Sequence, residues 1–306
     1  MTITSPSLAQ HRLYFRLLFV SCLLLTGFVH TARAVGNIGA VTGSSAAAWN
    51  AQTSTWSVVG ITNTGFAQVV GTAFPETHTW ASSSASALWW EPENWNSLKE
   101  PESGWQAMVI NFFVASTQQA IVSDDSTVHS IDVAGIPGAM SIVVESGTTL
   151  TATHGVHVGT NGRIDLQNGT LTTTTLELDG GSLIGQGSVQ ADINNAGVLS
   201  PGNSAGQIDV TGSYTQTIDG TLAIEIGGLA AGTEYDRLNT VTAELAGTLD
   251  VELFNGFTPS LSDSFEILTA TTGITGTFDN LLLPALAGNL AWNVLYGVSV
   301  SFVGGC

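Results

Sequence analysis

The chain has 306 residues, with six Lys and Arg against 24 Asp and Glu, and a formal net charge of −18 at pH 7. This acidic excess argues against nucleic acid as a partner, because phosphate binding rests on clustered Lys and Arg. Only 10% of the residues are charged, so uncharged polar side chains and glycine must cover most of the folded surface.

The first 34 residues have the pattern of a secretory signal peptide. Two arginines precede an apolar run, and a small-residue cleavage site ends at Ala34. The run is too short to span a bilayer, so we expect an exported chain, secreted or at the cell surface, with no transmembrane segment after cleavage. Cys22 leaves with the peptide, and Cys306 then has no intrachain partner. Pairing of Cys306 between chains and the oligomeric state stay open.

Residues 35–120 form a Trp-rich N-terminal region that holds seven of the eight tryptophans. Because Trp is usually largely buried, we interpret Trp89, Trp90 and Trp95 as a cap over the open end of the repeats that follow. The alternative is that these indoles lie exposed and stack on sugar rings, which would make the region a glycan-binding module.

Residues 121–226 carry an irregular repeat in which glycine precedes a large aliphatic residue. The glycines are Gly147, Gly162, Gly181, Gly197, Gly220 and, beyond this region, Gly247. Helical periodicity is missing, and short strands rich in Thr, Val and Ile alternate with turns. The sequence therefore predicts an all-β fold, a right-handed parallel β-helix or β-solenoid, with a β-sandwich as the alternative. In the solenoid, one inner column contains Ile164, Leu183, Leu199 and Leu222.

Two histidines close in sequence, His154 and His157, suggest a metal pair, since imidazoles are common zinc ligands. On a regular strand, residues three apart point to opposite faces. Unless Gly155 forms a bulge, the two imidazoles cannot share an ion, so the sequence predicts no metal site and no cofactor.

Aspartates spaced along the repeats are compatible with a carbohydrate-active enzyme. They are Asp165, Asp179, Asp192, Asp209 and Asp219. A hydrolase needs two carboxylates held a fixed distance apart, and adjacent coils of a solenoid can supply such a pair. We favour the simpler interpretation that these carboxylates are solvated residues at turns.

The segment Gly202-Asn203-Ser204-Ala205-Gly206 matches the G-x-S-x-G nucleophile elbow of α/β-hydrolases. That motif needs a helix after the serine and a histidine later in the chain. Here a strand-like segment follows, and no histidine comes after Ser204. We therefore predict a turn between coils, in which Gly and Asn accept positive φ, and no catalytic residue.

Residues 227–306 are predicted to form a β-rich C-terminal module. The segment 248–254 alternates apolar and polar residues over a longer stretch than the repeats do. After residue 226 the chain leaves no room for a membrane barrel of many long strands.

Several segments resemble a known group of proteins. They are WWEPENW (89–95), NAGVLSPGNS (195–204), YTQ (214–216), EYDRL (234–238), GTLDV (247–251) and FEILTA (265–270). They are similar to segments of bacterial secreted and surface proteins with autotransporter-passenger-like β-helix repeats, although the translocator barrel of a true autotransporter is not expected here. The resemblance implies a structural or adhesive role without catalysis, with other surface proteins or glycans as partners. The alternatives are a polysaccharide lyase or hydrolase on a β-helix and the glycan-binding module.

Overall fold

The computed structural model describes most of the chain after residue 75 and two short segments before it. The described residues are 46–50, 55–59 and 76–305, without 83, 97, 112–116, 136–137, 289 and 298. The predicted signal peptide (1–34), its cleavage site after Ala34, and Cys306 lie outside these residues. The part of the chain that the structure describes has no helix with the length and apolar character needed to cross a membrane.

The chain divides into two compact units, Met1–Phe74 and Pro75–Cys306. In the first unit, β1 (Ala46–Asn50) and β2 (Thr55–Val59) form an antiparallel pair. The predicted boundaries at residues 120 and 226 both fall inside the second unit, where strands on either side of them belong to one sheet.

The regular secondary structure of the second unit is almost all strand, so the prediction of an all-β chain is confirmed. Among its described residues the one helix is the short 3₁₀ turn η1 (Pro92–Asn94). The strands are β3 (Glu76–Thr79), β4 (Ser86–Leu88), β5 (Trp105–Asn111), β6 (Gln118–Val122), β7 (Ser126–Gly135), β8 (Met140–Val144), β9 (Thr149–Val158), β10 (Gly162–Pro201), β11 (Gln207–Val210), β12 (Ser213–Gln216), β13 (Thr221–Ile226), β14 (Arg237–Leu245), β15 (Thr248–Leu253), β16 (Ser264–Gly276), β17 (Asn280–Leu282), β18 (Ala291–Tyr296) and β19 (Ser299–Gly305).

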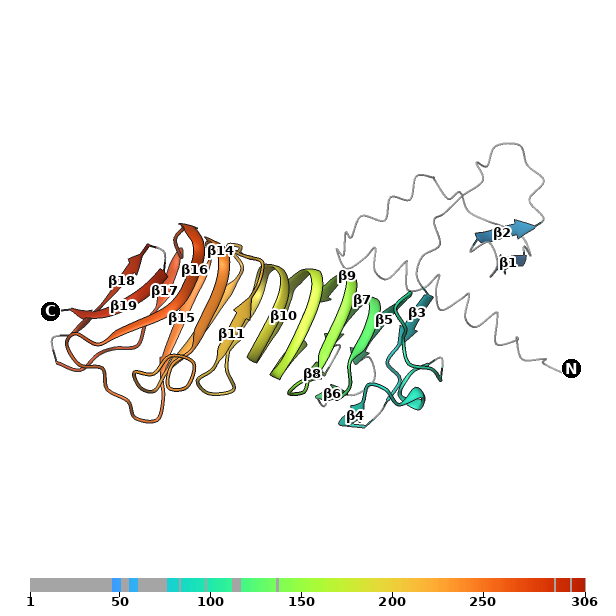
Figure 1. The fold of residues 1–306 in the computed structure, drawn as a ribbon, viewed down its shortest axis with the longest axis horizontal. Helices are drawn as coiled ribbons and strands as arrows, with labels where there is room; N and C mark the ends of the chain where they lie inside the picture. Colours follow the sequence, from blue (N-terminus) through green and yellow to red (C-terminus); the bar gives the residue numbers. More distant parts are fainter. Residues whose placement is uncertain are drawn as a thin grey trace, which may run out of the picture. The chain divides into compact units, whose positions relative to one another are not determined.

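These strands form one long mixed sheet in which most pairs are parallel. From β3 to β15, each strand pairs with one that lies some 20 to 30 residues later; Met140, for example, is aligned with Gly162, and Gln207 with Arg237. We call the stretch of chain between two such aligned residues a coil. Figure 1 shows successive coils side by side along the length of this unit. At the C-terminal end the direction reverses, because β19 runs antiparallel to both β16 and β18.

The predicted aliphatic column lies in the core. Ile164, Leu183, Leu199 and Leu222 have no measurable exposure to solvent. In the register of the sheet, Leu199 is aligned with Leu222 and Leu222 with Leu249. Aliphatic side chains of consecutive coils therefore lie directly over one another, as the repeat predicts.

One member of the predicted repeat belongs elsewhere. Leu150, which follows Gly147, is aligned with Leu171, whereas Ile164 is aligned with Ile142. The assignment of Gly147 to the same repeat was therefore wrong. The aligned residues that include Leu150 and those that include Ile164 are both buried. A short apolar strand fits either set, and the sequence pattern alone does not distinguish them.

Three buried polar side chains join consecutive coils inside the core. Asn195, Tyr214 and Gln216 are each at most 1% exposed. Asn195 donates to the Tyr214 hydroxyl (3.0 Å) and to the Thr221 carbonyl (3.0 Å), and Gln216 donates to the Ala246 carbonyl (2.8 Å). Since each amide finds partners, burial leaves no uncompensated polar group at this corner.

The repeated glycines from Gly162 onward lie where one coil approaches the backbone of the coil before it. A Cβ atom on Gly197 would overlap the carbonyl oxygen of Gly181, and one on Gly247 would overlap that of Gly220. No side chain that moves aside is involved, so the close approach of two backbones requires glycine. This is the physical reason for the glycine at the start of each repeat.

Replacing Gly197 by alanine is expected to lower the free energy of unfolding by about 1–3 kcal/mol, because the added methyl group forces the two backbones apart. Gly104 is the matched control, since a Cβ there meets no atom within 4 Å, and Gly104→Ala should change stability by less than about 0.5 kcal/mol. Urea denaturation measures both. Equal effects of the two variants would contradict the packing of coil on coil.

Candidate functional site

Three tryptophans form a buried cluster before β5. The ring of Trp95 contacts those of Trp80 and Trp89 edge to face, with centroids 5.2 Å and 4.8 Å apart. Its Nε1 donates to the Trp89 carbonyl over 2.7 Å. Trp90, in contrast, is 44% exposed. Of the three tryptophans considered for glycan contact, Trp90 therefore presents its ring to solvent, while Trp89 and Trp95 pack inside.

The segment around Ser204 forms a turn that leads into β11. Gly202 and Ser204 have φ values of 98° and 96°, so the positive φ falls on Gly and Ser rather than on Gly and Asn as the sequence predicted. Asn203 instead donates its side-chain amide to Asp165 of an earlier coil (3.3 Å). Ser204 itself is exposed. A turn followed by a strand lacks the helix on which a nucleophile elbow depends.

A buried carboxylate from the next coil holds this turn. Asp236 is fully buried and accepts two backbone hydrogen bonds, from the N–H of Gly206 (2.8 Å) and from that of Glu225 (2.8 Å). The N–H of Arg237 donates in turn to the Gly206 carbonyl (2.9 Å). Two segments of the resemblance, around Ser204 and around Tyr235, are thus joined by one side chain.

Burial dominates the protonation of this carboxyl group. Desolvation raises the pKa of Asp236 to about 7, and although the two N–H donors oppose this rise, the Glu225 carboxylate adds to it. Between pH 4 and 7 the folded chain then binds a proton more tightly than the unfolded chain, whose aspartates titrate near pH 4. Stability is therefore expected to fall as pH rises through this window.

We expect Asp236→Asn to remove a slope of up to about 1.4 kcal/mol per pH unit from the free energy of unfolding between pH 4 and 7. Urea denaturation of wild type and variant across this range measures the difference. The variant must be compared with wild type because a second group, His157, also makes stability fall as pH rises near neutrality. Burial lowers the pKa of His157, but the contacts with Asp132 and Asp179 outweigh burial and raise that pKa. The exposed Asp219, changed to Asn, is the control and should keep the full slope. Parallel curves for wild type and Asp236→Asn would contradict the raised pKa.

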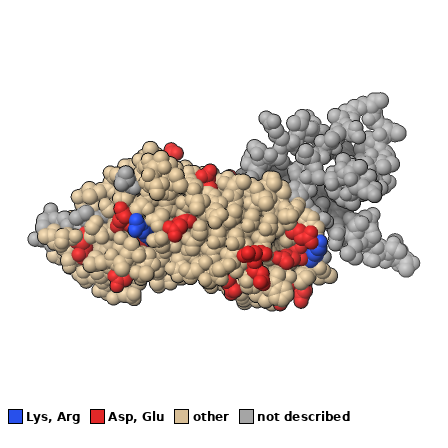
Figure 2. All heavy atoms as spheres, in the orientation of Figure 1, with Lys and Arg blue, Asp and Glu red and all other residues tan. Residues whose placement is uncertain are grey.

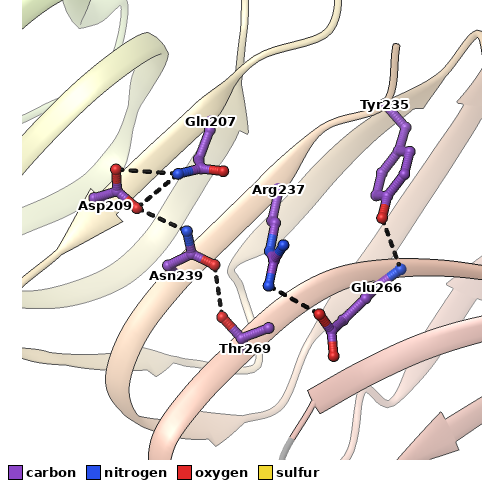
Figure 3. Close-up of polar contacts among 7 residues, drawn as sticks. All are labelled: Gln207, Asp209, Tyr235, Arg237, Asn239, Glu266 and Thr269. Atoms are coloured by element: carbon purple, nitrogen blue, oxygen red, sulfur yellow. Dashed lines mark hydrogen bonds and ion pairs between the residues drawn. The ribbon is translucent and has the colours of Figure 1, made fainter. Parts of the chain in front are cut away.

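Outward side chains of three consecutive coils form a polar ladder, which we define as Asp209, Asn239 and Thr269. Asn239 donates to Asp209 (2.7 Å) and accepts from the Thr269 hydroxyl (2.6 Å). Figure 3 shows this ladder crossing from β11 through β14 to β16, with Gln207 donating to Asp209 beside it. Each side chain is thereby fixed by its neighbour in the next coil.

Two of these strands, β14 and β16, carry a charged contact beside the polar ladder. Arg237 donates to the Glu266 carboxylate over 2.8 Å, and the Glu266 backbone N–H donates to the Tyr235 hydroxyl (3.3 Å) (Figure 3). Around it, acidic side chains are scattered over a surface that is mostly uncharged, as Figure 2 shows for one face of the molecule. The outer surface therefore matches the composition, with little positive charge.

Two of the other aspartates singled out from the sequence, Asp192 and Asp179, also contact a residue of another coil. Asp192 accepts hydrogen bonds from the backbone N–H and the hydroxyl of Ser213 (both 2.8 Å), and these bonds lower its pKa. Asp179 lies 3.7 Å from His157, and Asp219 is exposed. Their contacts go to amide, hydroxyl or imidazole groups, whereas a glycoside hydrolase would use two carboxylates that face each other.

The two neighbouring histidines have different partners. His157 is nearly buried and lies between Asp132 (3.4 Å) and Asp179 (3.7 Å). His154 is exposed and stacks on His129, with ring centroids 3.8 Å apart. The described residues hold no group of three or more His, Cys, Asp or Glu placed to bind a metal ion. The sequence pattern did not point to His129 as the partner of His154, because the two residues lie in consecutive coils rather than on one strand.

No model of a protein family matches the chain, and no curated protein sequence matches it. The likeness to autotransporter-passenger-like repeats therefore remains a prediction from the segments quoted above.

Proposed function

We propose that this chain is a secreted or cell-surface protein built as a right-handed parallel β-solenoid, and that it serves as a structural or adhesive element rather than as an enzyme. The parallel register supports the solenoid, since Leu199, Leu222 and Leu249 of consecutive coils are aligned. In such a fold each coil buries its apolar face against its neighbours, and the whole is an extended rod.

The observation that carries the proposed role is the polar ladder. Because Asp209, Asn239 and Thr269 bond to one another across three coils, their rotamers are set before any partner arrives. A surface whose side chains are fixed in advance loses little conformational entropy on binding. Its low positive charge suits neutral surface glycans or proteins better than acidic polymers.

Adhesion is tested with beads that carry the full chain, held under flow over immobilised neutral polysaccharides, acidic polysaccharides and extracellular proteins. We expect retention on a neutral surface at least tenfold above beads that carry an unrelated acidic protein. Asn239→Lys, which places a positive charge in the polar ladder, should reduce this retention, while Trp90→Ala should leave it unchanged. Retention on no surface would overturn the adhesive role.

Two outcomes of the same experiment would favour the alternatives. Loss of retention in Trp90→Ala but not in Asn239→Lys would assign binding to the exposed indole, which is the observation that favours a glycan-binding module. Release of soluble sugar from any polysaccharide would establish a carbohydrate-active enzyme. Export is tested separately by N-terminal sequencing of the exported protein. Its first residue should be Val35.

A further inference from the structure

At one corner of the coil, strand β9 has one residue more than β7, the strand aligned with it in the preceding coil. Val128 of β7 is aligned with Ala152, and Ser130 with Gly155. Between these pairs, the single residue His129 therefore lies opposite both Thr153 and His154. This is a β-bulge, an insertion that turns a side chain in a new direction.

The extra residue belongs to β9, because the segment of β10 aligned with this corner in the next coil also has one residue fewer than β9. Ala152 is aligned with Thr173 and Val156 with Leu176, so three residues of β9 face two of β10. Gly155, at φ +151°, supplies the unusual backbone conformation. The extra residue is what brings His154 over His129, with the two rings 3.8 Å apart and 9° from parallel.

The hydroxyl of Thr153 contacts Nδ1 of the His154 ring and two carbonyl oxygens of the preceding coil. The Thr153 hydroxyl donates its one hydrogen toward the carbonyl oxygens of Val128 (3.4 Å) and His129 (3.3 Å). The same oxygen lies 3.0 Å from Nδ1 of His154, and when its own hydrogen points to the carbonyls it accepts a hydrogen from that nitrogen. In that tautomer Nε2 of His154 keeps its lone pair, which is the form in which imidazole binds a metal.

His129 offers a second nitrogen in the same place. Its Nδ1 lies 3.4 Å from the Ser130 hydroxyl, and a hydrogen donated from Nδ1 to that hydroxyl leaves the Nε2 lone pair for an outside ligand. His154 is exposed and His129 partly so. The backbone beneath is held from the next coil, since the Thr174 hydroxyl donates to the His154 carbonyl (2.9 Å).

The geometry points to a two-histidine site, His129 and His154, that binds one divalent transition-metal ion through the two Nε2 atoms, with water completing the coordination. Imidazole ligands suit Cu²⁺, Ni²⁺ and Zn²⁺, whereas Mg²⁺ and Ca²⁺ prefer oxygen. The strong negative charge of the chain raises the local concentration of cations. On binding, the stacked rings splay until their lone pairs converge, and the ion links two consecutive coils. This site does not depend on the proposed adhesive role.

Isothermal titration of the full chain with CuSO₄ and with ZnCl₂ at pH 7.5 tests the site. We expect one tightest equivalent per chain, with Cu²⁺ bound more tightly than Zn²⁺. His129→Gln and His154→Gln should each raise Kd at least tenfold. Thr153→Val keeps both imidazoles but removes the hydroxyl that orients one of them, and should raise Kd about tenfold. His78→Gln is the control and should leave Kd unchanged.

Electron paramagnetic resonance of the Cu²⁺ complex gives a readout that does not depend on affinity. Two imidazole nitrogens are expected in wild type and one in either single variant. Thermal unfolding of each variant shows that the loss of a ligand is not a loss of fold. Unchanged binding in His154→Gln, or the same nitrogen count in wild type and His129→Gln, would overturn the site.

Discussion

Replacing Trp95 with alanine is expected to lower the free energy of unfolding by about 3–5 kcal/mol, the range for large aromatic residues removed from a core. The indole is fully buried, contacts two other indoles edge to face and donates to the Trp89 carbonyl. Its loss leaves a cavity and an unpaired carbonyl at the first coils. Urea denaturation measures the change, and hydrogen exchange should show β3 to β6 opening first.

Trp90→Ala is the matched control for this prediction. It removes the same type of side chain from a nearby position that is 44% exposed. Surface substitutions usually change stability by less than about 0.5 kcal/mol. A small effect in both variants would show that the tryptophan cluster does not stabilise this end of the sheet. A large effect in Trp90→Ala alone would show that the packing is reversed.

Leu222→Ala should cost about 2–5 kcal/mol, because the side chain lies in the middle of the aligned aliphatic column and the cavity cannot collapse between two fixed coils. Leu222 is fully buried and aligned with Leu199 before it and Leu249 after it. Equilibrium denaturation measures the loss. Ile218→Ala, at a site 70% exposed, is expected to be nearly neutral. If Leu222→Ala proved equally neutral, the column would not be the core.

Residues whose local pattern and environment agree could be predicted from the sequence. The units at Gly197, Gly220 and Gly247 each place an aliphatic residue after a glycine, and the three aliphatic residues are indeed aligned. Leu150 was misplaced because parallel pairing depends on the length of each coil, which varies along the chain. A buried strand of one row looks the same as a buried strand of another.

The polar groups were harder to predict, because their partners lie one coil away rather than nearby in sequence. The turn at Ser204 was predicted from local turn chemistry, but the role of Asp236 in holding it was not. Likewise, Gly155 was recognised as a possible bulge, yet nothing local indicated that the bulge would turn His154 onto His129. The long-range register is set by the whole sheet. The local pattern of a single sequence therefore predicts it poorly.

The reversal of direction at β19 has a consequence for how these chains meet one another. An uncovered edge strand presents unpaired backbone N–H and C=O groups, and these form a template that a strand of another chain can extend. Along β16, the backbone groups that a further parallel strand would use are already bonded to β19 in the opposite sense. The final hairpin thus acts as a stop that keeps this strand from serving as a seed for polymerisation.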